Sequence, residues 1–112
     1  MNDTRAPYDA GNALPMTLDA YRNRGCSRPW SDPGYTHPSP EEVAQLIRLA
    51  GWSTNEAADI VGVKRDVKHG SATIRKWKSA HAGKTNREIP YSAWRLMLLH
   101  AGVVELELVL RG

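Results

Sequence analysis

The sequence has 112 residues, of which 41% are hydrophobic and 24% are charged, and its single cysteine is Cys26. This length suits one domain, and no apolar run approaches the roughly 20 residues that a membrane helix needs. The first residues lack the apolar segment of a secretory signal, and a lone thiol can form no internal disulfide. The composition therefore predicts a cytoplasmic protein without a membrane partner, held together by its core.

The net charge of +3 is distributed unevenly along the chain. Residues 64–87 contain eight Lys or Arg and one acid, a net charge of +7, whereas residues 39–63 carry −3. Because a polyanion meets one face of a protein, such clustering matters more than the total charge. A basic run can also be a solvated loop, so the place of these residues in the fold decides what they do.

Residues 1–38 are expected to form an irregular N-terminal arm, because prolines and turn-forming residues recur through them. Only residues 17–23 favour a short helical turn, with Leu18 and Tyr21 three positions apart. Trp30 and Tyr35 stand among turn formers. Their rings either pack as a lid on the helical core or form an aromatic pair that binds a partner.

Residues 39–102 are predicted to be the helix-turn-helix domain, a compact all-α unit of four to five helices. The first helix begins at residues 39–42, Ser-Pro-Glu-Glu, a capping box with proline at the first helical position. Gly51 supplies the left-handed residue that ends it. Its apolar positions recur at i, i+3, i+4 and i+7, as expected for one buried face: Val43, Leu46, Ile47 and Ala50.

A second capping box, residues 53–56, begins a short helix with two adjacent alanines in its middle. Such small residues let another helix cross closely. A Gly-Val pair at 62–63 ends this helix, since glycine readily adopts a positive φ. A third helix is predicted over residues 71–80, with Ile74 and Trp77 three positions apart and facing inward.

Pro90 opens a last helix, and Gly102 ends it. The tail, residues 103–112, alternates Glu and Leu in its middle, which favours a short apolar strand, although its composition also allows a helix. A lone strand needs a pairing partner, so this tail is a candidate dimerisation element. The buried positions of the last helix are predicted to be Ala93, Trp94, Met97, Leu98 and Ala101.

Residues 56–63 and 73–77 resemble the lambda-repressor-like (Xre-type) helix-turn-helix family of DNA-binding proteins. A small-residue helix, a Gly-Val turn and a helix with apolar residues three apart carry this resemblance, which extends over residues 39–102. The sequence departs from the family in one respect. Nine residues, 64–72, separate the Gly-Val pair from Thr73, where the family usually has about three, so the turn carries an insertion of roughly six. The resemblance implies a recognition helix for duplex DNA and places Ser71, Ala72 and Lys76 where base-reading side chains usually lie.

With Ile74 and Trp77 turned inward, the opposite face of helix 71–80 points outward. A helix of roughly 10–12 Å diameter fits the major groove of B-DNA, and Lys or Arg can donate to guanine there. The enlarged turn, residues 64–70, either lengthens this helix, forms a basic flap or stays in solvent. The predicted base-reading residues are Ser71, Ala72, Thr73, Arg75 and Lys76. The predicted phosphate contacts are Lys64, Arg65, Lys68, His69, Lys78, Ser79, Lys84 and Arg87.

The sequence therefore predicts a sequence-specific DNA-binding transcriptional regulator, in particular a repressor of bacterial, phage or mobile-element type. We expect it to bind double-stranded DNA as a homodimer, because one short helix reads only a few base pairs. The alternative is a protein-interaction module of antitoxin or inhibitor type, which would dock a partner through the helix-turn-helix or the aromatic arm. RNA fits less well, since its deep, narrow major groove does not admit a helix.

No catalytic or metal-binding pattern accompanies these features. The four histidines have no His, Cys or acid partner at ligand spacing, so no metal is expected. No Gly-rich phosphate loop follows a strand, and no pocket is indicated. The sequence thus predicts no enzyme activity, no cofactor and no small-molecule ligand. Cys26, close to Arg24 and Arg28, is expected to have a depressed pKa.

Overall fold

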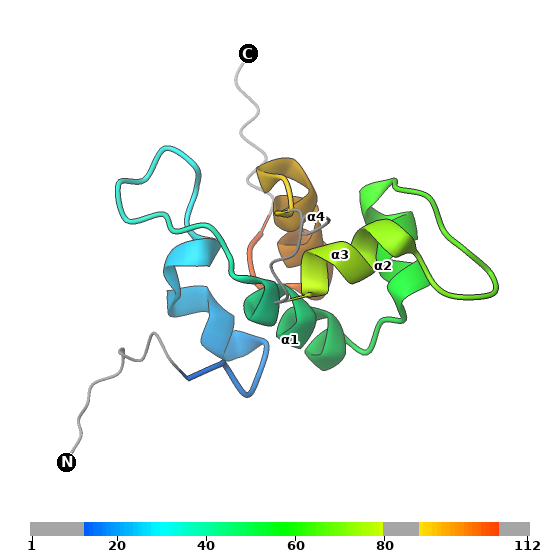
Figure 1. Ribbon diagram of the computed structural model, residues 1–112. Coiled ribbons are helices and arrows are strands. Elements are labelled where there is room, and N and C mark those ends of the chain that lie inside the picture. The colour runs from blue at the N-terminus through cyan, green and yellow to red at the C-terminus, as the bar shows by residue number, and fades with distance from the viewer. Residues whose placement is uncertain (1–12, 80–87, 106–112) are drawn as a thin grey trace.

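The computed structural model describes residues 13–79 and 88–105, and within these ranges it contains four α-helices and no strand (Figure 1). The all-α prediction is thereby confirmed. No described helix is long and apolar enough to cross a membrane. The α-helices are α1 (Pro40–Ala50), α2 (Thr54–Val61), α3 (Ala72–Lys78) and α4 (Tyr91–Ala101), and two short 3-10 helices precede them, η2 (Asp19–Asn23) and η3 (Gly25–Ser27).

Both predicted capping boxes form and set the starts of α1 and α2. The Ser39 hydroxyl accepts from the Glu42 amide at 3.1 Å, while the Glu42 carboxylate accepts from the Ser39 amide at 2.9 Å. Ser53 and Glu56 repeat this exchange at 3.0 and 2.7 Å. Each pair satisfies amides that a helix start otherwise leaves unbonded. The two helices therefore begin where these local signals place them.

The core lies between the four α-helices. α3 packs against α1 and α2, and α4 packs against the same two helices. The adjacent alanines of α2 are fully buried, which lets both neighbours approach its backbone closely. The helical residues of this core are Val43, Leu46, Ile47, Ala57, Ala58, Ile74, Trp77, Ala93, Trp94, Met97 and Leu98.

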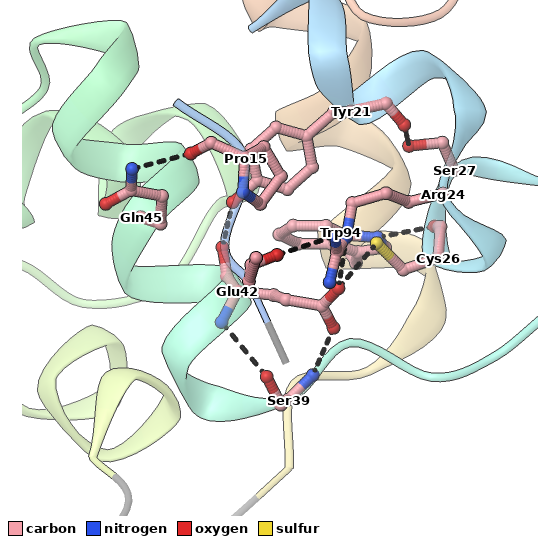
Figure 2. A network of polar contacts seen from close by, with 10 residues as sticks. Pro15, Tyr21, Arg24, Cys26, Ser27, Ser39, Glu42, Gln45 and Trp94 are labelled. Carbon is pink, nitrogen blue, oxygen red and sulfur yellow. Dashed lines mark hydrogen bonds and ion pairs between the residues drawn. The ribbon is translucent and has the colours of Figure 1, made fainter. Parts of the chain in front are cut away.

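The described part of the predicted N-terminal arm is built into this core. Tyr21 is 0% exposed, and its hydroxyl donates to the Glu42 carbonyl at 2.7 Å. The Trp94 indole N–H donates to the Cys26 carbonyl at 2.8 Å, and the Arg24 guanidinium pairs with the Glu42 carboxylate at 2.8 Å (Figure 2). These bonds join the segment to α1 and α4, so it is part of the folded unit and does not lie apart from it.

The expected depression of the Cys26 pKa is wrong. The thiol is 1% exposed, and burial raises its pKa from 9.0 to about 12. The Glu42 carboxylate, 3.6 Å from the sulfur, adds to the increase. Arg24 lowers the pKa less than these effects raise it, and its charge is paired with Glu42. Desolvation therefore outweighs the neighbouring positive charge, and the thiol stays protonated at neutral pH.

Trp30 and Tyr35 pack together at the start of α4. Their ring centroids lie 5.5 Å apart, and each ring also contacts Tyr91, at 5.2 and 5.5 Å. The Trp30 amide donates to the Tyr91 hydroxyl at 3.1 Å. Trp30 nevertheless remains 65% exposed. The pair thus covers the start of α4, as the lid interpretation requires, and leaves the Trp30 ring largely open to solvent.

The tail follows α4 directly. Val103 is buried, and Val104 packs against the core in part. Residues 106–112, which carry most of the predicted apolar strand or helix, lie outside the described residues.

Candidate nucleic-acid interface

α3 has one buried face and one exposed, basic face. Ile74 is 0% exposed and Trp77 is 4% exposed, so both point into the protein as predicted. Arg75 and Lys76 lie on the exposed side. Burial of the two apolar residues fixes how the helix rotates about its axis, and this rotation presents the cations to solvent.

The structure corrects the prediction for Ser71. Its side chain is completely buried, and its hydroxyl accepts from the Ile74 amide at 3.4 Å as the N-cap of α3. A buried capping hydroxyl cannot reach a base edge, so Ser71 positions the start of the helix instead. The other predicted base-reading residues lie on the helix itself: Ala72, Arg75 and Lys76 are exposed, and Thr73 is half-buried.

The enlarged turn between α2 and α3 is held against α2 by the Asn55 side chain. The Asn55 amide oxygen accepts from the Asp66 N–H at 3.0 Å, and its amide nitrogen donates to the Asp66 carbonyl at 2.9 Å. The Asp66 carboxylate accepts from the amides of Lys68 and His69 at 2.9 and 3.1 Å. These bonds give the loop a defined backbone. The turn therefore forms a basic flap rather than an extension of α3, which begins only at Ala72.

The end of the flap lies against the first turn of α2. Gly70 has a φ of +81°, and a Cβ atom at this position would collide with the Thr54 hydroxyl. The positive φ favours glycine at this position, and any larger residue would also force the Thr54 side chain to move. Because Gly70 immediately precedes the N-cap of α3, this contact brings the beginnings of α2 and α3 next to each other.

The described phosphate candidates lie on the flap and at the end of α3. Arg65 forms an exposed ion pair with Asp59 of α2 at 3.2 Å, an interaction that surface solvation makes weak. Two further candidates, Lys84 and Arg87, lie outside the described residues. The exposed flap candidates are Lys64, Arg65, Lys68 and His69, and the half-buried helix-end candidates are Lys78 and Ser79.

Two residues of this surface were missed from the sequence. Asn55 anchors the flap, and Val67 stands 87% exposed among its cations. A lone valine within a basic run was the available signal for the second residue. Nothing local marks Asn55, since its partner Asp66 is eleven residues away.

The described part of the chain contains no cluster of three or more His, Cys, Asp or Glu residues that could hold a metal ion. The buried Trp77 indole N–H has no hydrogen-bond partner among the described residues. Its ring packs in the core and anchors α3 there.

Together, α2, its lengthened turn and α3 form a helix-turn-helix pair in an all-α protein, with the cations of α3 turned to solvent. No family model and no solved structure matches the chain. Two similar proteins are transcriptional repressor proteins KorC from Escherichia coli. One is 35% identical over 88 residues, covering 79% of this chain and 92% of the relative, and the other is 29% identical over 69 residues, covering 62% and 72%. The chain therefore belongs to the KorC family of transcriptional repressors.

Proposed function

We propose that this chain represses transcription by binding duplex DNA with α3 in the major groove. The observation that carries the proposal is the exposure of Arg75 and Lys76 opposite the buried Ile74 and Trp77. Lys and Arg donate to the O6 and N7 atoms of guanine, and the short side chain of Ala72 permits close approach at the leading end of the helix. We assign α2, the turn and α3 to the lambda-repressor-like (Xre-type) class of helix-turn-helix. The proposed base-reading residues are Ala72, Thr73, Arg75 and Lys76.

The flap and the end of α3 are proposed to hold the sugar-phosphate backbone. Phosphate contacts set affinity and orientation without reading sequence. If about five cations each neutralise one phosphate, the logarithm of the binding constant falls with the logarithm of salt concentration at a slope of roughly −4 to −5 per subunit. The proposed contacts are Lys64, Arg65, Lys68, His69, Lys78, Ser79, Lys84 and Arg87.

A homodimer is proposed because α3 is short. Two copies would read half-sites about 34 Å apart, one turn of the duplex. A groove of about 540 Å³ at the end of α4 supports this, since Leu96, Leu99 and Val104 line it together with His100, Gly102 and Glu105. Apolar surface of this kind suits a second copy of the same chain. Analytical sedimentation of the Leu96→Lys variant tests this groove as the dimer interface. The variant is expected to sediment as a monomer, with its helical content unchanged.

The test of DNA binding uses a duplex selected from genomic fragments by the purified protein. Lys76→Glu is expected to weaken binding about 100-fold or more, since a base contact is lost and a like charge faces the DNA. Lys76→Gln should give an intermediate loss. Neither change touches the core, because Lys76 is exposed. Equal binding by wild type and Lys76→Glu would overturn the proposal.

A second candidate function, docking of a partner protein, is favoured by one observation. Trp30 is 65% exposed within its aromatic cluster, and Trp residues are frequent anchors of protein interfaces. Trp30→Ala separates the two functions, because it should leave duplex binding unchanged. If Trp30→Ala abolishes repression while Lys76→Glu does not, the protein-docking function is correct instead.

A further inference from the structure

Val67 is the most exposed large hydrophobic residue in the described part of the chain, at 87%. Single apolar residues are common on protein surfaces and need no explanation there. Val67 differs because it stands on a flap whose exposed neighbours are cations, Lys64, Arg65, Lys68 and His69. These cations are the groups that would approach a polyanion, so Val67 would meet the same partner.

The backbone on both sides of Val67 is fixed by hydrogen bonds. Asn55 binds the N–H and the carbonyl of the preceding residue, Asp66. The Asp66 carboxylate accepts from the amides of the two following residues, Lys68 and His69. A loop built in this way holds its side chains in place before it binds. Little conformational entropy remains to be lost on binding, which makes a small apolar contact effective.

The flap also lies at the end of the molecule that the helix-turn-helix would present to DNA. Its bonds to Asn55 and its contact with Thr54 hold it beside the first turn of α2, next to the start of α3. Figure 1 shows the loop projecting beyond the α2–α3 pair. A side chain there would reach base pairs or backbone next to those that α3 reads.

We propose that Val67 is a second base-reading residue, which contacts the 5-methyl group of a thymine in the major groove next to the site of α3. The thymine methyl is the apolar feature that base edges present in that groove, and apolar side chains recognise it. The cations of the flap would hold the adjacent phosphates and keep the isopropyl group at the base edge. The inference rests on the proposed function and extends the recognition surface from α3 to the lengthened turn.

The test combines Val67→Ala with removal of single methyl groups from DNA. The full-length protein is titrated with its selected duplex and with duplexes in which each thymine in turn is replaced by deoxyuridine, which lacks only the 5-methyl group. One replacement is expected to weaken the wild type about four-fold, the effect of about one buried methyl group. The same replacement should leave Val67→Ala unaffected, and the salt dependence should be equal for both proteins.

Two controls isolate the contact. Met16→Ala, at a residue that is 76% exposed outside the flap, should bind every duplex as the wild type does. Thermal unfolding should be unchanged in both variants, because neither side chain packs in the core.

The proposal is overturned if Val67→Ala binds the selected duplex like the wild type. It is also overturned if Val67→Ala and the wild type lose the same affinity at every deoxyuridine, which would indicate a contact to sugar, phosphate or the minor groove. These results leave the proposed function intact when Lys76→Glu still weakens duplex binding about 100-fold or more, so the two failures are distinguishable.

Discussion

The N-terminal segment and the flap are two stretches of the described chain that lie outside the α-helices, and they use their side chains in opposite ways. The N-terminal segment, residues 13–38, lies on one side of the molecule, and the flap between α2 and α3 lies on the other (Figure 1). The first segment buries side chains, Tyr21 and Cys26 among them, in the helical core. The flap instead satisfies its backbone through Asn55 and keeps its side chains in solvent.

This difference predicts which segment supports folding and which supports binding. Burial of an aromatic side chain stabilises a fold by several kcal/mol, whereas exposed charges contribute little. The longer turn between α2 and α3 also costs the fold little, because the entropy of closing a surface loop rises only slowly with its length. The N-terminal segment should therefore determine the stability of the protein, and the flap should determine what its surface can bind.

The largest effect is expected from Tyr21→Ala, which would remove a fully buried ring from the core. We expect the free energy of unfolding to fall by about 3–5 kcal/mol, as for other buried aromatic residues. Tyr21→Phe keeps the ring and loses only the bond to the Glu42 carbonyl, so it should cost about 1 kcal/mol. Urea denaturation measures both values. A stable Tyr21→Ala variant would show that residues 13–38 do not belong to the folding unit.

A smaller effect distinguishes the two tryptophans of the core. Trp94→Phe removes the donor to the Cys26 carbonyl and should destabilise the protein by about 1–3 kcal/mol, because a buried acceptor loses its partner. Trp77→Phe should cost less, since the Trp77 N–H has no partner among the described residues and only ring volume is lost. Thermal unfolding of the two variants side by side gives the comparison. A larger loss for Trp77→Phe would contradict it.

The sequence predicted the elements that local signals specify. The capping boxes at Ser39 and Ser53 and the inward positions of Ile74 and Trp77 depend on residues within one or two helical turns, and all of them are confirmed. Burial of Cys26 and its bond to Trp94, 68 residues away, depends on how the chain folds back on itself. Periodicity carries no information about such contacts.

The candidate site shows the same division between local and long-range information. The exposure of Arg75 and Lys76 followed from the helical period of their neighbours. Ser71 was misassigned because the sequence did not establish where α3 begins, and one position separates a capping residue from a surface residue. The conformation of the flap could not be predicted, since it depends on the pairing of Asn55 with Asp66 across the turn.

Asn55→Ala tests the role of the flap, because it removes the side chain that holds the flap against α2. Two hydrogen bonds to Asp66 are lost, and we expect the free energy of unfolding to fall by about 1–2 kcal/mol. The amides of Lys68 and His69 should exchange their hydrogens faster, and duplex affinity should fall because the flap is no longer ordered before binding. Asp59→Asn is the matched control. It removes only the exposed ion pair with Arg65 and should change stability by less than about 0.5 kcal/mol.

The smallest effect concerns the buried thiol of the N-terminal segment at high pH. Burial raises the pKa of Cys26 from 9.0 to about 12, so above pH 9 the unfolded chain releases this proton while the folded chain keeps it. Stability that is fully present below pH 9 is therefore lost as the pH rises, by roughly 1 kcal/mol between pH 9 and pH 10. Cys26→Ala lacks this group, and its unfolding free energy should decline less steeply over the same interval, although it is lower throughout. Parallel pH profiles for the two proteins would mean that the thiol titrates normally, as it would in an exposed segment like the flap.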